Sequence, residues 1–83
     1  MTTYCVRVSA PMLEMRPWLP VKSWRITEYG SPDRHGYAYC TAEDDDAPPE
    51  LEGALVVPTF RHHADGSVTV ISREVLAPPQ RNA

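Results

Sequence analysis

The residues of this sequence that could do chemistry are three histidines, two cysteines and a dense run of carboxylates. The first five, which are His35, His62, His63, Cys5 and Cys40, belong to the types that ligate zinc. The sequence contains no Cys-x2-Cys pair and no pair of histidines at zinc-finger spacing. Adjacent residues of a strand point to opposite faces, so His62 and His63 do not readily share one metal. We therefore predict no metal site and no cofactor.

Covalent catalysis would need a nucleophile with a base in reach, and Cys40 with His35 or His62 is the candidate. Cys40 falls in an apparent strand among aromatic residues, where a thiol is normally buried and unreactive. The sequence has no glycine-rich phosphate loop, no nucleophile elbow and no metalloprotease motif. We predict that the protein is not an enzyme and assign no catalytic residue. A metal- or thiol-dependent enzyme is the third of three function hypotheses.

The acidic residues are concentrated between positions 43 and 52. They are Glu43, Asp44, Asp45, Asp46, Glu50 and Glu52, with no basic residue among them. The whole chain has a net charge of only −3, so the remainder is mildly basic. Pro48 and Pro49 are typical of a solvated, extended connector. The alternatives are a negative surface that meets a basic partner and a divalent cation site, although the spacing of an EF-hand loop is missing.

Alternation of apolar and polar residues predicts the elements that must position these groups. The expected strands are 2–9, 22–29, 37–41, 54–62 and 68–72, with residues 75 and 76 extending the last strand after a break. Prolines at 11, 17 and 20 leave room for at most one short helical turn. The prediction is a mainly β protein: a small antiparallel five-stranded sheet curled into a barrel or roll.

The best-specified element is a hairpin that turns at Asp65-Gly66. Of the two registers that this turn permits, we prefer a three-residue loop with Gly66 in the left-handed conformation. That register sets His62 opposite Val68 and Phe60 opposite Val70, and it places Phe60 and the two valines on one face. Pro58 predicts either an edge strand or a bulge, because proline cannot donate to a ladder.

The chain is expected to form one domain over residues 1–76, with an acidic loop at 43–52 and a flexible tail at 77–83. It contains neither a long apolar run nor a secretory signal. The expectation is therefore a cytoplasmic protein without a membrane partner. Whether Cys5 and Cys40 form a disulfide is open at this stage.

The leading hypothesis is a small non-enzymatic protein-binding module that contacts a larger protein or protein complex, such as one that binds nucleic acid. Its contacts would be the acidic loop and Trp18, an aromatic residue of the type that anchors interfaces. Size and concentrated acidity are analogous to phage and mobile-element inhibitors of host machinery, anti-CRISPR proteins among them, in which such a loop would mimic nucleic acid. The analogy extends to size and charge alone, because no motif in the chain matches a named family.

The second hypothesis is a small β-barrel that binds single-stranded nucleic acid. Arg7 and Arg25 fall on the predicted outer face, and Tyr37, Tyr39 and Trp24 could stack on bases. The acidic balance of the whole chain counts against it. A homodimer through the strand that carries Pro58 is a further option, although proline there disfavours strand pairing.

Overall fold

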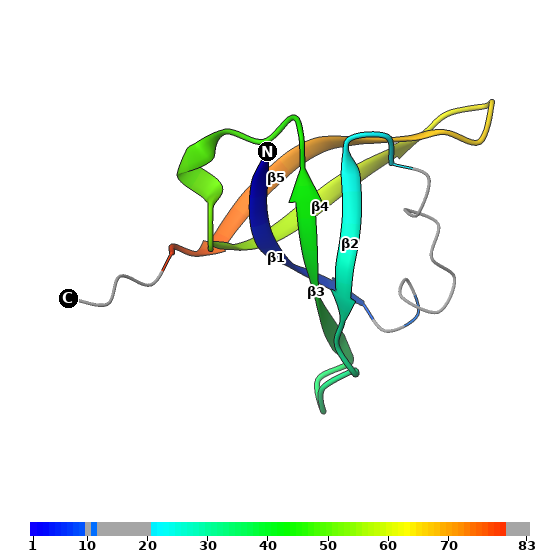
Figure 1. The fold of residues 1–83 in the computed structure, drawn as a ribbon. Helices are drawn as coiled ribbons and strands as arrows, with labels where there is room; N and C mark the ends of the chain where they lie inside the picture. Colours follow the sequence, from blue (N-terminus) through cyan, green and yellow to red (C-terminus); the bar gives the residue numbers. More distant parts are fainter. Residues whose placement is uncertain (10, 12–20, 80–83) are drawn as a thin grey trace.

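The computed structural model describes residues 1–9, 11 and 21–79, and its elements are mainly strands. They are β1 (Thr2–Ser9), β2 (Trp24–Tyr29), β3 (Tyr37–Asp44), the 3-10 turn η1 (Pro49–Leu51), β4 (Leu55–His62) and β5 (Val68–Ala77). The five strands form one sheet in the order β2-β3-β1-β4-β5 (Figure 1). The predicted mainly β architecture with five strands is confirmed. Among the described helical residues, none belongs to a helix long and apolar enough to cross a membrane.

The sheet is mixed, whereas a wholly antiparallel one was expected. β1 pairs with β3 in antiparallel register from Thr2–Asp44 to Ser9–Tyr37. β4, in contrast, runs parallel to β1 through two residue pairs, Cys5–Leu55 and Val6–Val56. The reason is the path of the chain after β3. β3 ends beside the start of β1, and the following residues return along Thr3, so that β4 sets off in the direction of β1.

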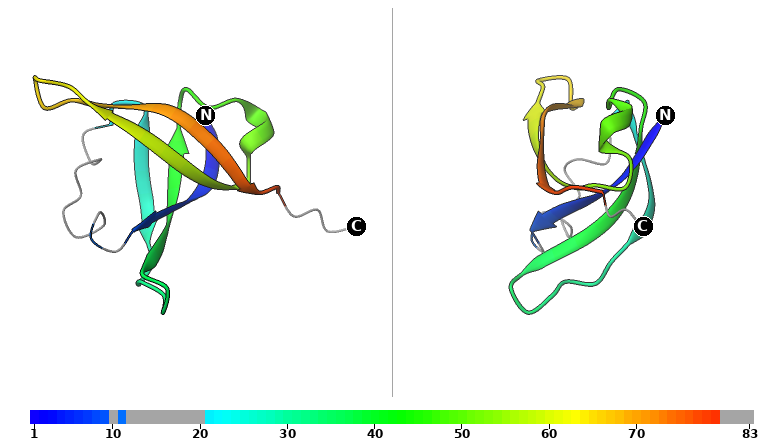
Figure 2. Two further views of the ribbon diagram at one scale, coloured as in Figure 1. Left: turned by 180° about the vertical axis from the view of Figure 1, so that it is seen from behind. Right: turned by 90° about the vertical axis from the view of Figure 1, so that its left-hand side faces the viewer.

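The short parallel ladder divides the sheet into two halves that face each other. In Figure 2, the β4–β5 hairpin crosses obliquely over the half formed by β2, β3 and β1. An isolated parallel bridge between Val21 and Val68 joins the segment before β2 to the start of β5 at one corner. The sheet is therefore curled into a roll, and its ladder order still leaves β2 and β5 at the two ends.

The core fills the space between the two halves. Tyr4, Val6 and Val8 alternate along β1, point inward, and are all buried. Val56, Val68 and Val70 close the core from the other half, and the rings of Trp24 and Phe60 meet edge to face at 5.4 Å. Side chains from both halves are thus needed to exclude water from either one.

The preferred register of the β4–β5 hairpin is confirmed. His62 pairs with Val68, Phe60 pairs with Val70, and Gly66 has a φ of 87°. Asp65 Oδ1 accepts hydrogen bonds from the backbone N–H and the hydroxyl of Ser67, and these bonds lower the pKa of Asp65. The left-handed glycine and the aspartate bonds together close the turn.

The sequence suggested a break before residues 75 and 76, but β5 is one continuous strand. Bulges accommodate the residues that have no direct partner on β4. Register shifts between Leu55 and Val56, and again between Thr59 and Phe60, leave Leu76 and Ile71 without a direct partner on β4. These two bulge residues are among the exposed large hydrophobics, with Ile71 50% and Leu76 48% accessible. Pro58 itself pairs with Arg73, and the second shift follows one residue later, between Thr59 and Phe60. A bulge is therefore present near Pro58, whereas the alternative of an edge strand is wrong, because β4 lies between β1 and β5.

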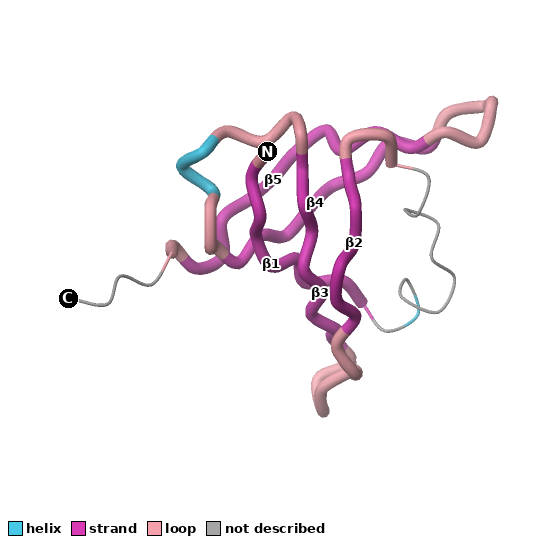
Figure 3. Tube along the Cα trace, in the orientation of Figure 1, coloured by secondary structure: helices cyan, strands magenta, loops and turns pink. Residues whose placement is uncertain are grey.

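A short 3-10 turn, η1, lies in the acidic segment, where Figure 3 shows it close to the N-terminus. The helical turn for which the sequence left room after Pro11 stays a prediction. Residues 12–20, including Trp18, lie outside the described residues, as do residues 80–83 of the expected tail.

Candidate functional site

The acidic run is divided between a strand and a connector. Glu43 and Asp44 are the last residues of β3, and residues 45–54, here called the acidic connector, lead to β4. Asp44 is completely buried, with 0% of its surface accessible. The expectation of one solvent-facing loop over 43–52 is therefore wrong for Asp44, which a partner cannot reach. The exposed carboxylates of the connector are Asp45, Asp46, Glu50 and Glu52.

Asp44 is the centre of a buried hydrogen-bond network that joins four strands. Its Oδ2 accepts from the Tyr4 hydroxyl, from Trp24 Nε1 at 2.8 Å and from Arg73 Nε at 2.7 Å. Its Oδ1 accepts from the backbone N–H of Asp46 at 2.9 Å and from Arg73 Nη2 at 3.3 Å. Because these donors come from β1, β2, β5 and the connector, Asp44 holds both halves of the roll together.

Two opposing effects act on the pKa of Asp44. Burial disfavours the charged form, but hydrogen bonds from Arg73, Tyr4, the Asp46 backbone and Trp24 together outweigh burial and hold the pKa below its usual value. Burial, reinforced by the bond to Asp44, raises the pKa of Tyr4. Asp44 is thus an ionised, fully paired carboxylate, and an acid with all its oxygens engaged by the fold is unsuited to proton transfer.

The connector is anchored along its length, unlike the extended, solvated linker that its prolines suggested. The Asp45 N–H donates to Ser23 O, and the Thr2 hydroxyl donates to Ala47 O at 3.0 Å. Leu51 is buried, and the Gly53 N–H donates to Thr3 O at 2.9 Å.

Glu52 completes this attachment, since its Oε2 accepts from the Thr3 N–H at 3.1 Å. The exposed carboxylates are therefore presented on a backbone that β1 holds in place. Anchoring the backbone keeps these like charges close to one another, which concentrates the negative potential at this surface.

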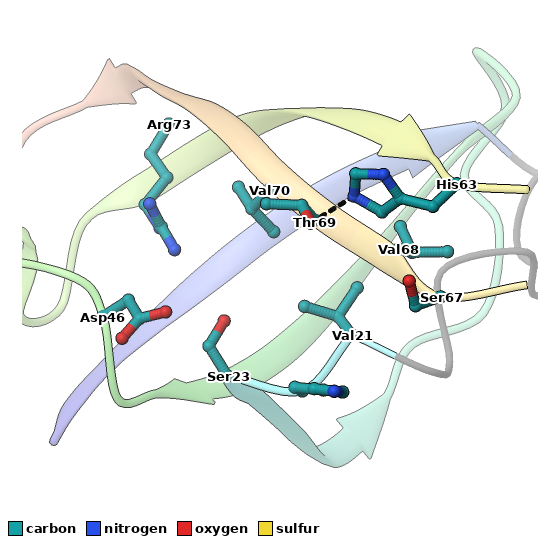
Figure 4. Close-up of a pocket in the computed structure, with 10 residues that line it drawn as sticks. Val21, Ser23, Asp46, His63, Ser67, Val68, Thr69, Val70 and Arg73 are labelled. Atoms are coloured by element: carbon teal, nitrogen blue, oxygen red, sulfur yellow. Dashed lines mark hydrogen bonds between the residues drawn. The ribbon is translucent and has the colours of Figure 1, made fainter. Parts of the chain in front are cut away.

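A cavity of about 190 Å³ lies along the seam between β5 and the segment before β2 (Figure 4). Val21, Val68 and Val70 line its apolar part. His63 stands at one end, where its Nε2 lies 2.7 Å from Thr69 Oγ1.

The charges around the seam cavity are mixed in sign. Lys22 and Arg73 bring positive charge and Asp46 brings negative charge, while Arg73 is already paired with Asp44. The cavity therefore does not select an ion of either sign.

The two cysteines are thiols on opposite faces of the sheet. Val6 pairs with Cys40, so Cys40 points into the core and is only 2% exposed, while Cys5 points outward and is partly buried. A disulfide between them would require one side chain to cross the sheet. Burial raises the pKa of Cys5, which makes its thiolate less available.

The described residues hold no group of three or more His, Cys, Asp or Glu side chains placed to bind a metal ion. His62 and His63 are both exposed beside the hairpin turn. His35 lies in the β2–β3 loop, where Arg34 Nε approaches its Nε2 at 3.4 Å.

The outer face of β1 and β3 carries the basic and aromatic residues that suggested nucleic-acid binding. The Arg7 guanidinium lies over the Tyr37 ring, 4.2 Å from its centroid. Trp24, in contrast, points inward to the Asp44 network, so it does not offer its ring to a base. Arg25 forms an ion pair with Glu43 at 2.6 Å, which offsets its charge.

Comparison with models of known protein families, with curated proteins and with solved structures finds no match for this chain. Its function must be inferred from its own geometry.

Sequence reasoning missed the network, although a signal for it was present. Alternation puts Ala38 and Cys40 on one face of the third strand, and continuing it places Ala42 and Asp44 on that face. An aspartate on the face of buried small residues is an inward-pointing charge. Such a charge is normally paired with a cation, which here is the partly buried Arg73.

Proposed function

We propose that this chain is a small, non-enzymatic protein-binding module whose acidic connector contacts a basic surface of a larger protein. One observation carries the proposal: the backbone that bears the exposed carboxylates of the connector is hydrogen-bonded to β1, as is the carboxylate of Glu52, and no basic residue lies among them. An interface that is already ordered before association loses less conformational entropy when it forms.

Charge also favours this role. A concentrated negative surface accelerates encounter with a positive one and disfavours acidic partners. A protein groove built to hold nucleic acid is a surface of that kind, so a nucleic-acid-binding protein or complex fits the connector. An inhibitor that occupies such a groove is the specific form of the proposal, as in the analogy with mobile-element inhibitors.

Zero-length cross-linking in a cell lysate tests the proposal. A carbodiimide joins carboxylates to lysine amines only where the two are in contact, so mass spectrometry maps the contacting acids. After nuclease treatment, we expect a captured protein cross-linked at Asp45, Asp46, Glu50 or Glu52. Capture should weaken as salt rises, because exposed charges are screened.

Two variants of equal charge change sharpen this test. Asp46→Asn/Glu50→Gln removes two connector charges, and Glu28→Gln/Glu74→Gln removes two exposed charges from the sheet. We expect the first to reduce capture and the second to leave it unchanged. Equal capture by both variants, or capture that disappears with nuclease, contradicts the proposal.

The stacked Arg7–Tyr37 pair favours a second candidate function, binding of single-stranded nucleic acid on the outer face of β1 and β3. Titration with a fluorescent oligonucleotide at low salt tests it. Binding that falls steeply with salt and that Arg7→Gln weakens would support this function. A flat titration contradicts it.

A further inference from the structure

A shallow hollow of about 420 Å³ opens on the outer surface of the roll, beside the acidic connector. Its walls include Cys5, Tyr39, Gly53, Leu55, Ala77 and Pro78, and none of its lining residues carries a charge. The hollow lies where β1 meets the start of β4 and the end of β5. It is thus separate from the seam cavity.

The backbone explains why a hollow forms at this place. The connector turns into β4 through Gly53, whose φ of 77° favours glycine over residues with a side chain. Glycine leaves this wall without a side chain, and Cys5 contributes only a small one from β1. Tyr39 and Leu55, both partly buried, stand on either side. The result is an apolar depression between larger side chains.

Negative charge borders the hollow on the connector side. Glu52 directly precedes Gly53, and its carboxylate is held at the N–H of Thr3, which lies on the same outer face of β1 as Cys5. Glu50 is exposed in the turn η1 just before it. On the opposite side, Arg7 is engaged with the Tyr37 ring. An apolar depression with carboxylates on one side complements an apolar side chain that is followed by cations.

We infer that the hollow and the acidic connector form one binding surface for a basic peptide segment with a central apolar anchor. The anchor, a leucine-sized side chain, fills the hollow, and lysine or arginine residues beside it face Glu52 and Glu50. This inference rests on the proposed function and specifies its partner. Protein interfaces usually have an apolar, buried centre and a polar or charged rim.

Three fluorescein-labelled peptides serve as probes in anisotropy titrations at low salt. GSKKLKKSG carries anchor and charges, GSKKSKKSG lacks the anchor, and GSEELEESG reverses the charges. We expect the leucine peptide to bind about tenfold more tightly than the serine peptide, the change that burial of one apolar side chain produces. The acidic peptide should not bind.

Two tryptophan substitutions locate the anchor. Ala77→Trp fills the hollow, and Ile71→Trp places the same bulk at an exposed bulge elsewhere on β5. Ala77→Trp should reduce the leucine peptide to the affinity of the serine peptide, whereas Ile71→Trp should preserve the tenfold difference. An equal effect of both substitutions overturns the assignment of the hollow.

Alkylation of Cys5 gives a readout on the native chain. Its thiol lines the hollow while Cys40 is in the core, so iodoacetamide at alkaline pH should modify Cys5 first. The leucine peptide, at a saturating concentration, should slow this reaction several-fold more than the serine peptide. Equal rates with both peptides overturn the inference.

The outcomes separate this inference from the proposed function. Equal affinity of the leucine and serine peptides, lost in Asp46→Asn/Glu50→Gln, overturns the anchor and leaves the acidic interface intact. A concentration-dependent dimer that Ala77→Trp dissociates assigns the hollow to a second copy and overturns the inference. Absence of binding by all three peptides also overturns it, and the cross-linking experiment then decides the proposed function by itself.

Discussion

Asp44 and Asp45 are adjacent residues of the same type, and the fold uses them in opposite ways. Asp44 ends β3 with its carboxylate in the core, where every oxygen is bonded and Arg73 balances its charge. Asp45 begins the connector and presents its carboxylate to solvent, although its backbone N–H is bonded to Ser23. One acidic run therefore supplies both a buried carboxylate that links strands by hydrogen bonds and an exposed charged surface. The difference teaches that burial and pairing, rather than residue type, decide what a carboxylate does.

Substituting alanine at each of the two positions should give the largest difference in the free energy of unfolding. Asp44→Ala leaves Arg73 and Tyr4 without their acceptor and should lower the free energy of unfolding by about 3–5 kcal/mol, as for a broken buried ion pair. Asp45→Ala should change it by less than about 0.5 kcal/mol. Urea denaturation followed by tryptophan fluorescence measures both. Similar values for the two variants would mean that the hydrogen bonds of Asp44 do not hold the strands together.

Replacing both partners tests whether the charge itself is needed. Arg73→Met alone leaves Asp44 buried without its cation and should destabilise the fold about as much as Asp44→Ala, by about 3–5 kcal/mol. The double variant Asp44→Leu/Arg73→Met removes both charges and should recover much of that loss, since apolar replacements of a buried pair are often neutral. A double variant as unstable as the sum of the single ones would assign the stability to the other bonds of Asp44.

The pH dependence of unfolding distinguishes the two carboxylates in the unsubstituted chain. Hydrogen bonds in the native state hold the pKa of Asp44 below its unfolded value, so the unfolded state binds the proton more readily. The stability that Asp44 contributes is therefore complete above about pH 5 and is lost as pH falls through its native pKa. Asp44→Asn should flatten this acid limb, and Asp45→Asn should retain it. An unchanged acid limb in Asp44→Asn contradicts the expectation.

Removing one hydrogen-bond donor from the Asp44 network should destabilise the fold less than removing Asp44 itself. Tyr4→Phe deletes the hydroxyl that donates to Asp44 and accepts from Trp24 Nε1, while the ring stays in place. Asp44 keeps its bonds to Arg73, Trp24 and the Asp46 backbone, so we expect a loss of about 1–2 kcal/mol. Thermal unfolding compares it with Tyr37→Phe, whose hydroxyl lies on the exposed outer face and should matter little.

Neutralising the external surface should leave stability nearly unchanged. Asp46→Asn/Glu50→Gln removes exposed charges that form no ion pair with the described residues. The free energy of unfolding should therefore shift by less than about 0.5 kcal/mol. Calorimetry measures this shift. A large loss of stability in this variant would show that the two regions are not independent.

Local patterns in the sequence predicted those parts of the fold that depend on neighbouring residues. Alternation placed the first strand at residues 2–9, as observed, and the turn chemistry at Asp65-Gly66 predicted the hairpin register correctly. Both depend on periodicity and on the conformational freedom of one glycine, which a sequence displays directly.

Long-range pairings could not be read in the same way. Periodicity marks a strand without naming its neighbour, so the parallel pairing of β1 with β4 was missed. The partner of Asp44 is Arg73, which follows the bulge at Ile71. Simple alternation from Val68 and Val70 would place the Arg73 side chain on the outer face, so the pair was not predicted. Treating residues 43–52 as one solvated loop concealed that Glu43 and Asp44 continue β3, with Asp44 on its inward face.

The bulges of β5 have a consequence for the behaviour of the chain at high concentration. A straight ten-residue strand at the end of a sheet offers its free backbone groups to any other strand, which is a common origin of fibrils. The interruptions at Ile71 and Leu76 twist β5 and break the regular spacing of those groups. The inward-pointing Arg73 adds a charge between them. The two bulges in β5 should thus disfavour aggregation by pairing of this strand with other copies. Deletion of Ile71 should shorten the lag time of aggregation in a thioflavin assay.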